Sequence, residues 1–356
     1  MNSNRLIDSF VNLVKINSES GFEEKIIDYL YQSIKGLGFN PLKDSYGNLI
    51  VNVDGIGEPL FLGAHVDTVK PGNSIKPQVK NGVIRSDGKT ILGADNKVAV
   101  TILLELLRDI SEKKIKTRPL DIVFTTSEEA GNLGAVNLDY SKIRAKKGYI
   151  FDSFKQIGTI VLGSPFYNRI EIKIIGKSAH ASMPEKGINA LQILAKAINA
   201  IKLGKINSKT IANIGTIEGG TVVNAVPGEI TVKGEVRSFL EKDMENYCKY
   251  IIGKFKTFAK EAGGDIKADI IRENAGYEYP LTDKFVESTI NKINKFGCKT
   301  SFSFPWSCSD ANIFNNKDMQ ILNLGDGVIN AHTVGECISI DDLSKLGKLV
   351  LYLATN

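Results

Sequence analysis

Histidines and acidic residues stand at the predicted ends of strands in this chain of 356 residues, which has only three histidines. One of them, His65, lies two positions before Asp67 in the segment GAHVDTV, at the end of an apolar run. Residues i and i+2 of a strand share one face, so Asp67 can accept a hydrogen bond from one ring nitrogen and leave the other for a metal ion. A solvated surface turn is the alternative, and the pair by itself does not distinguish the two.

Four further segments add to this pair. The segment LGADNKVAV places Asp95 at the entrance of an apolar helix, where capping is the ordinary role of an aspartate. In FTTSEEAG the adjacent Glu128 and Glu129 must point in different directions, so one can bind a metal while the other reaches an attacking water. Asp152 ends the run YIFDS, and His332 lies in NAHTVGE. Solvated loop residues are the alternative for each, but together they indicate a site at the carboxyl ends of several strands.

The elements that would position these residues alternate between strands and helices. Apolar runs such as PLFLGAHV and LDIVFTTS are separated by helical patterns at 5–16, 22–36 and 97–108. After a central segment with a different pattern, helical patterns at 282–296 and 341–353 continue this alternation of strands and helices. The alternation predicts an α/β sheet that is covered by helices on both faces.

The central segment has the sequence pattern of a sheet with one solvent-exposed face. Runs such as RIEIKIIG and EITVKGEVRS alternate polar and apolar residues, and helices are expected near 187–202 and 241–262. The chain also exceeds the roughly 250 to 300 residues at which single cores stop growing. We therefore predict a discontinuous catalytic domain at 1–165 and 276–356 and an inserted α+β domain at 166–275.

Composition argues against several other functions. The net charge of +5 contains no run of five or more like charges, which gives no support for nucleic-acid binding. We expect a cytoplasmic protein without a membrane partner, because the chain shows neither the apolar core of a signal peptide nor a stretch long enough to span a bilayer. The segment GVIRSDGKT has five residues between its glycines, whereas a phosphate-binding P-loop needs four.

The order and wording of the motifs resemble a known family, the two-metal peptidases and deacylases that include peptidase T, carboxypeptidase G, aminoacylase and succinyl-diaminopimelate desuccinylase. The matching pieces span almost the whole chain in the family order and are most similar to the peptidase T branch: HVDTVKPG, LGADNKVAV, TTSEEAGNLGA, FDS, GKSAHASMPEKGINAL, GGTVVNAVPGEITVKGEVRS, SDANIFN and NAHTVGECISI. The resemblance implies a zinc-exopeptidase-like domain with a mixed, mainly parallel sheet and an inserted lid and dimerisation domain, hence a homodimer.

The resemblance also implies a metal centre. Asp95 would bridge two zinc ions, with His65 and Asp152 completing one site and Glu129 and His332 the other. Cobalt and manganese are alternatives to zinc. Three carboxylates and two neutral imidazoles leave one positive charge on two divalent ions, which a bridging hydroxide neutralises.

Further residues take their implied roles from the same resemblance. Glu128 looks like the general base and Asp67 like the acid that orients the first histidine. His180 is similar to a residue that stabilises the oxyanion, often at the site of a partner subunit, although a lone histidine is more often a satisfied side chain of its own domain. Arg237 and Asn224 resemble residues that hold the substrate, and a strand-surface charge is the alternative for Arg237.

Two positions depart from the closest members of the family. Asn96 stands where they usually have a second aspartate, and Trp306, the only tryptophan, stands near SDAN where glycines are common. We expect a metal-dependent hydrolase that cleaves an amide bond in small peptides, as a tripeptide aminopeptidase does. An N-acyl amino acid deacylase or a carboxypeptidase with the same metal centre is the first alternative. A catalytically silent peptide-binding protein is the second.

Overall fold

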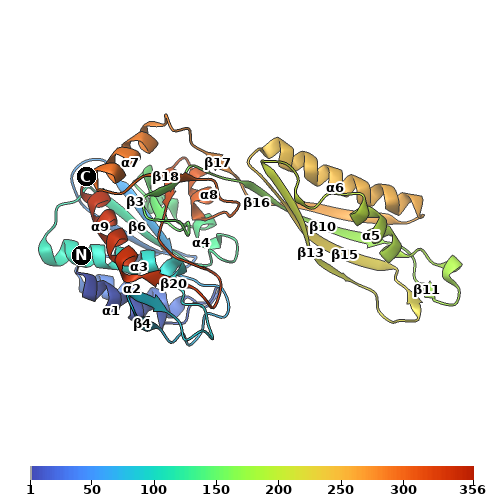
Figure 1. The fold of residues 1–356 in the computed structure, drawn as a ribbon, viewed down its shortest axis with the longest axis horizontal. Helices are drawn as coiled ribbons and strands as arrows, with labels where there is room; N and C mark the ends of the chain where they lie inside the picture. Colours follow the sequence, from blue (N-terminus) through green and yellow to red (C-terminus); the bar gives the residue numbers. More distant parts are fainter. Residues whose placement is uncertain (1) are drawn as a thin grey trace. The chain divides into compact units, whose positions relative to one another are not determined.

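The computed structural model describes residues 2–356, and the chain divides into two compact units (Figure 1). The larger unit comprises Met1–Leu162, Tyr279–Pro305 and Ser309–Asn356. The smaller unit comprises Gly163–Glu278 and the short segment Trp306–Cys308. The chain thus builds most of the larger unit, forms the smaller one as a long insertion, and then completes the larger one.

A mixed, mainly parallel sheet forms the centre of the larger unit, as the sequence predicts. Its eight strands run in the order β1-β2-β6-β3-β7-β19-β8-β18. Strands β6, β3, β7 and β19 are parallel neighbours, whereas β2 pairs with β1 and with β6 in the antiparallel direction. The strand bounds are β1 Leu42–Lys43, β2 Leu49–Val53, β3 Leu60–His65, β6 Leu120–Thr125, β7 Lys147–Phe151, β8 Thr159–Val161, β18 Ser301–Ser303 and β19 Gln320–Leu324.

Helices cover both faces of this sheet. All six residues of β3 are buried, which requires a packed layer on each side of the strand. On one face Leu62 belongs to a core shared with α1, α2, α3 and α9, and on the other Phe61 meets Phe314 of α8 edge-on with ring centroids 4.8 Å apart. The bounds are α1 Ser3–Val14, α2 Glu24–Gly36, α3 Ala94–Lys113, α4 Leu133–Val136, η1 Tyr140–Lys142, α7 Lys284–Lys295, α8 Asp310–Asn315 and α9 Ile340–Thr355.

A small three-stranded sheet completes the larger unit. It consists of β20, β5 and β4, in that order, and joins the chain before α3 to the chain before α9. The strand bounds are β4 Gln78–Lys80, β5 Val83–Arg85 and β20 Cys337–Ser339. The loop that leads to β20 carries His332 and Glu336, so this sheet helps to bring the late part of the chain beside the start of α3.

The smaller unit is a five-stranded antiparallel sheet with two helices on one face. Its strand order is β12-β13-β15-β10-β16, and α5 and α6 cover a core that includes Ile172 and Val232. The opposite face carries ion pairs, such as Arg169 with Glu273 at 2.6 Å, as the alternating pattern predicts. The bounds are β9 Gly163–Ser164, β10 Phe166–Ile175, β11 Ala179–His180, η2 Pro184–Lys186, α5 Ala190–Asn199, β12 Gly204–Lys205, β13 Thr210–Gly219, β14 Ala225–Val226, β15 Glu229–Ser238, α6 Glu241–Glu261, β16 Asp265–Asn274 and β17 Tyr277–Glu278.

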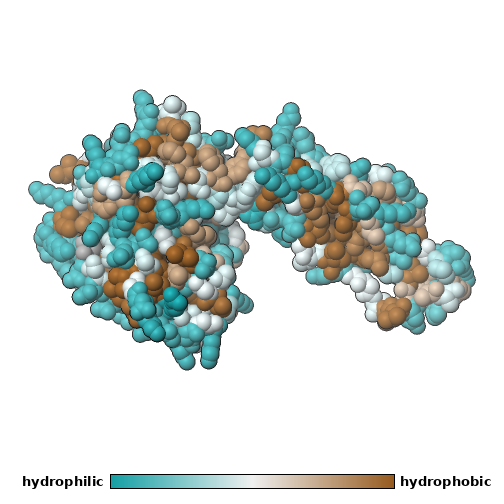
Figure 2. All heavy atoms as spheres, in the orientation of Figure 1, coloured by the Kyte–Doolittle hydropathy of each residue, from teal (hydrophilic) through white to brown (hydrophobic). Residues whose placement is uncertain are grey.

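Apolar residues remain at the surface of the smaller unit, where Figure 2 shows them gathered on the visible face. Ile217 of β13 is 51% exposed, and Val222 in the following loop is 60% exposed. Exposed apolar side chains that lie together are typical of surfaces that contact another protein. Within residues 2–356, no helix combines the length and apolar character that crossing a membrane requires.

The contact between β3 and β7 leads to a prediction about stability. A methyl group added to Gly148 would stand 2.1 Å from the carbonyl oxygen of Phe61 on the neighbouring strand. Because only backbone movement could relieve this overlap, we expect Gly148→Ala to lower the free energy of unfolding by about 1–3 kcal/mol. Thermal and urea denaturation measure this change.

Gly253→Ala in α6 is the matched control, since no atom lies within 4 Å of the added methyl group. Alanine is the better helix former, so this variant should be more stable by about 0.5–1 kcal/mol. Equal stability of Gly148→Ala and the wild type would contradict the tight strand contact.

Candidate metal centre

The candidate site lies where neighbouring parallel strands end. His65 is the last residue of β3, Glu128 and Glu129 lie in the loop after β6, and Asp152 follows β7 directly. His332 lies in the loop after β19. Because β6, β3, β7 and β19 are parallel neighbours, their carboxyl ends share one edge of the sheet.

Asp95 reaches the same edge from the start of α3. Its backbone angles and those of Asn96 are not helical, so regular helix begins after them, where the sequence pattern begins. The Asp95 side chain does not cap the helix. Its Oδ1 lies 3.1 Å from Nε2 of His65, and its Oδ2 lies 2.7 Å from Nε2 of His332. The two oxygens of one carboxylate thus face two different histidines.

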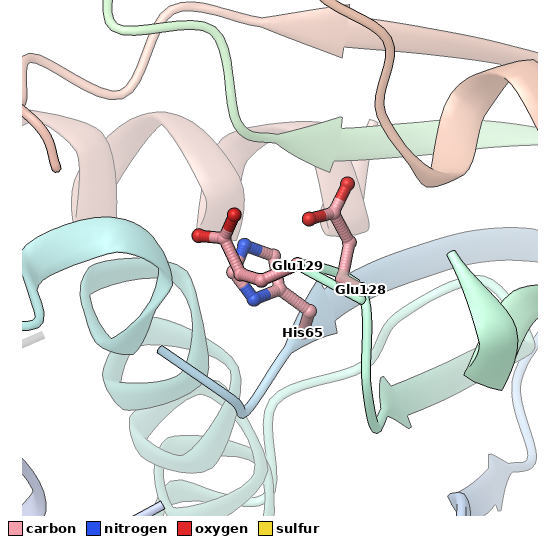
Figure 3. A group of neighbouring side chains, drawn as sticks. All are labelled: His65, Glu128 and Glu129. Atoms are coloured by element: carbon pink, nitrogen blue, oxygen red, sulfur yellow. The ribbon is translucent and has the colours of Figure 1, made fainter. Parts of the chain in front are cut away.

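The structure brings all five predicted ligand residues together, in two groups that share Asp95. In each of these groups, the possible ligand atoms lie within 4.8 Å of one another. One group contains His65 and Asp152, and the other contains Glu129 and His332. A further group joins Glu128 and Glu129 to His65, and Figure 3 shows the two glutamates rising from the loop beside the histidine.

Burial makes this cluster electrostatically unfavourable for the protein alone. Burial and the neighbouring carboxylates raise the pKa of Glu128 and of Asp152 well above the usual range. Burial also opposes ionisation of Asp95, but hydrogen bonds with His332 and His65 outweigh it and lower the pKa of Asp95. The nearby carboxylates of Asp95 and Glu129 raise the pKa of His332 to about 10. The acids therefore draw positive charge into the site.

The donor set fits divalent metal ions. Oε1 of Glu129 is buried and takes part in no hydrogen bond, although it lies only 2.9 Å from Nε2 of His332. That nitrogen carries at most one proton, and Asp95 is its closer partner. Imidazole nitrogen and carboxylate oxygen are the ligands that zinc and related ions prefer. A cation would give the unpaired oxygen a partner and offset the clustered negative charge.

Asp67 contacts both His65 and the loop that carries the two glutamates. Nδ1 of His65 lies 3.1 Å from the backbone oxygen of Asp67 and 3.4 Å from its carboxylate Oδ1. The same carboxylate accepts the backbone N–H of Glu128 at 2.9 Å and that of Glu129 at 3.1 Å. The hydroxyl of Ser20 also donates to it at 2.7 Å. Asp67 therefore contacts the histidine and also holds the loop that carries both glutamates, a contact that the sequence does not reveal.

Sequence reasoning missed Glu336. Its carboxylate is buried and accepts the backbone N–H groups of Leu92 and Gly93 at 2.7 Å and of Asp95 at 2.9 Å. Glu336 thus fixes the segment that presents Asp95. It lies four positions after His332 in NAHTVGE, so its acidic side chain could be noticed in the sequence. Its partners lie more than two hundred residues away along the chain, so its role could not be predicted.

Asn323 is a second missed residue. Its side-chain oxygen accepts the backbone N–H of Asp152 at 2.9 Å, and its side-chain nitrogen donates to the backbone oxygen of Asp152 at 2.6 Å. Asn323 belongs to β19, the parallel neighbour of β7, so this pair of hydrogen bonds fixes the backbone where β7 ends.

Asn96, one of the two departures from the family pattern, is buried, and its Nδ2 has no hydrogen-bond partner among residues 2–356.

His180 and Asn224 lie together in the smaller unit. The backbone oxygen of Asn224 accepts the N–H of Ala181 at 2.8 Å, next to the pairing of β11 with β14. Nδ1 of the exposed His180 accepts the backbone N–H of Ser182 at 3.2 Å. The hydroxyl oxygen of Ser182 lies 2.8 Å from the same ring nitrogen, so both contacts engage Nδ1 rather than Nε2.

Arg237 is already engaged within the smaller unit. Its Nε and Nη2 donate to the two carboxylate oxygens of Glu235 at 3.2 and 3.0 Å, and its guanidinium lies over the ring of Tyr167 at 4.3 Å. Nη1 donates to the backbone oxygen of Trp306 at 3.0 Å, and the indole ring packs on Phe239. Arg237 therefore contacts both Glu235 and Trp306, and Trp306 is one of the two positions that depart from the family pattern.

Two family models match the chain. The model described as a peptidase dimerisation domain matches residues 167–263, which lie in the smaller unit. The model described as peptidase family M28 matches residues 48–151, which lie in the larger unit. This stretch includes three of the five predicted ligands, His65, Asp95 and Glu129. Each unit thus has a counterpart among peptidases.

Similar proteins match along nearly the whole chain. The uncharacterised protein YqjE of Bacillus subtilis is 34% identical over 99% of this chain and 98% of its own. The structure of the aminopeptidase PepT from Bacillus cereus is 36% identical with a TM-score of 0.91, and that of a tripeptidase from Staphylococcus aureus is 34% identical with a TM-score of 0.95. Both structural comparisons cover 99% of this chain and 98% of the other.

Fold, site and similarity together define a metallopeptidase. The chain belongs to the peptidase T-like branch of the family of metal-dependent peptidases and deacylases, which confirms the resemblance seen in its motifs. Divalent metal use follows from this family, and the carboxylate and imidazole cluster is the place in the larger unit that fits it.

The hydrogen bonds of Glu336 lead to a prediction. In Glu336→Gln only one side-chain oxygen can accept, and the amide group would face backbone N–H groups that it cannot satisfy. We expect a loss of about 1–3 kcal/mol in the stability of the metal-free protein and a weaker affinity for metal, because the segment that presents Asp95 is no longer fixed. Thermal unfolding with a chelator and metal titration measure the two effects.

Glu287→Gln, a change on the surface of α7, is the control and should leave both quantities unchanged. Wild-type stability and metal affinity in Glu336→Gln would show that the three backbone hydrogen bonds do not matter for the site.

Proposed function

We propose that the protein is an aminopeptidase that hydrolyses short, unblocked peptides, most efficiently tripeptides, with water activated at a two-metal centre. The observation that carries this proposal is the position of Asp95, whose two oxygens face His65 and His332 and so belong to two separate groups of ligand atoms. The aminopeptidase and tripeptidase names of the similar structures support the choice of substrate.

The ligand roles follow from the two groups. Asp95 would bridge two ions, with His65 and Asp152 holding one and Glu129 and His332 holding the other. Zinc suits these nitrogen and oxygen donors, and cobalt or manganese would suit them as well. When bound, the ions would polarise the scissile carbonyl group and lower the pKa of a water molecule.

Glu128 would act as the general base. It shares the loop of the ligand Glu129, but it belongs to neither of the two groups built around Asp95. Asp67 holds the backbone N–H of both glutamates, which fixes where each side chain begins. The carboxylate of Glu128 would accept a proton from the attacking water and deliver it to the leaving amine.

The smaller unit would supply substrate contacts. The contacts of His180 with Ser182 engage Nδ1, and its Nε2 would donate a hydrogen bond to the developing oxyanion. Asn224 and Arg237 would hold the peptide, and the planar guanidinium suits a terminal carboxylate. Glu235 already occupies two nitrogens of Arg237, so a peptide carboxylate would use the remaining N–H groups or displace Glu235.

We further propose that the protein forms a homodimer through the smaller unit. The match to a peptidase dimerisation domain and the exposed apolar residues of this unit support the proposal. A catalytically silent peptide-binding protein is disfavoured, because it would not need Glu128 beside a complete set of ligand residues.

The substrate proposal predicts the outcome of a panel assay. Metal-loaded protein should cleave free tripeptides faster than dipeptides, N-acyl amino acids or N-blocked peptides, because the proposed site accepts a short peptide with a free amine. Release of the N-terminal residue, followed by chromatography, measures the reaction. Faster turnover of N-acyl amino acids would favour a deacylase, and release of the C-terminal residue from blocked peptides would favour a carboxypeptidase.

The roles of the two adjacent glutamates predict different mutant behaviour. Glu128→Gln should lower turnover by about 10²- to 10⁴-fold, because an amide cannot accept the proton from water, and should keep the metal content of the wild type. Glu129→Gln should reduce the metal content from two ions per chain toward one, because a ligand is weakened. Elemental analysis after dialysis and steady-state kinetics measure these effects.

Each glutamate variant is the matched control for the other, because the two changes are chemically identical and one residue apart. Interchanged phenotypes would show that the roles of Glu128 and Glu129 are reversed. One ion per chain in the fully loaded wild type would reject the two-metal centre.

A further inference from the structure

Asn132, in the loop after β6, lies between the carboxylate of the half-buried Glu128 and that of the buried Asp310. Its Nδ2 donates to Oε1 of Glu128 at 2.7 Å and to Oδ1 of Asp310 at 3.1 Å. Asn132 is only 3% exposed and Asp310 only 4%. An amide nitrogen has two hydrogens, and two carboxylates offer only acceptors when ionised, so each hydrogen has one carboxylate to meet. The orientation of the amide follows from this arrangement.

Asp310 is itself held on both sides. The hydroxyl of Thr125, the last residue of β6, donates to its Oδ2 at 2.6 Å, while Asn132 donates to its Oδ1. Asp310 is the first residue of α8, and Ser309 caps that helix in a capping box with Asn312. Asp310 is therefore tied to the sheet and to a capped helix, which makes it a rigid anchor for the amide.

The fold of the loop has its own backbone hydrogen bonds. The N–H groups of Gly131 and Asn132 donate to the carbonyl of Glu128 at 2.9 and 2.7 Å, and the N–H of Leu133 donates to Ser127. Asn132 has a φ of +58°, a conformation that glycine, asparagine and aspartate accept most easily. The side-chain amide is thus separable from the loop conformation, because the backbone bonds remain when the amide is removed.

We propose that Asn132, anchored by Asp310, is a positioning residue for the general base Glu128. The amide occupies Oε1 of Glu128 and so directs Oε2 to receive the proton from the attacking water. It also places a neutral donor between two carboxylates that would otherwise repel each other. This inference rests on the proposed function, since it assigns Asn132 a role through Glu128.

The experiment uses two substitutions that suit a positive φ. Asn132→Gly removes the amide without backbone strain, and Asn132→Asp keeps the shape but has at most one proton for two carboxylates. We expect both variants to lower kcat by about ten- to a hundredfold, less than the full loss of a general base, with KM within about twofold of the wild type. Metal content should equal that of the wild type, because Glu128 is not a ligand in the proposed centre.

Asn137→Ala is the matched control, because this nearby exposed asparagine donates only to the carbonyl of Leu133 and should keep wild-type kcat. The decisive comparison is made in the Glu128→Gln background, at high enzyme concentration. There Asn132→Gly should cause no further loss of kcat, because no base remains to be positioned. The same fold loss in both backgrounds would overturn the proposal, since the amide would then act on the loop as a whole.

Two other results would also overturn it. Wild-type kcat in both Asn132 variants would remove the residue from catalysis, and loss of metal would show that it acts through Glu129. Failure of the proposed function looks different, because the wild type itself would then cleave no peptide of the panel while its metal content remained normal.

Discussion

The arrangement of the larger unit depends on buried negative charge collected at one edge of a sheet. Asp95, Glu129 and Asp152 converge there with two histidines, and burial raises the pKa of Asp152. Isolated charges are costly away from water, so such a cluster is stable only with compensating cations. Divalent ions supply that charge in a small volume. The strand order, the helices that cover both faces and the loops after the strands all serve to bring these few side chains together.

The loops that carry the ligands are held by other buried acids. Asp67 accepts the backbone N–H groups of both loop glutamates, and Glu336 accepts three backbone N–H groups at the start of α3 and just before it. Hydrogen bonds to charged acceptors are stronger than neutral ones, which suits segments that have no regular secondary structure of their own. The same chemical group therefore appears in two roles, as a ligand at the centre and as a backbone clamp around it. Replacing a clamp disturbs the site without touching a ligand.

The smaller unit is stabilised differently, by one buried apolar face and one face of ion pairs. Its sheet buries one face beneath α5 and α6 and covers the other with ion pairs, while apolar side chains such as Ile217 stay exposed. His180, Asn224 and Arg237 all lie on this scaffold, but only Arg237 is held by side-chain partners on several sides. Glu235, Trp306 and Tyr167 surround Arg237, so the guanidinium is already engaged before any ligand binds.

The sequence by itself determined the chemistry and the family. Ligand types such as His65 and Glu129 are read directly from the residues, and the order of the motifs identified the peptidase T-like branch. Periodicity predicted the sheet classes and located α3 and α6, because side-chain alternation is a local property. The tertiary structure alone decided which oxygen of Asp95 faces which histidine, and that Asn132 joins Glu128 to Asp310 across 178 positions. These contacts depend on how distant strands are ordered in the sheet, and no local pattern in the sequence encodes that order.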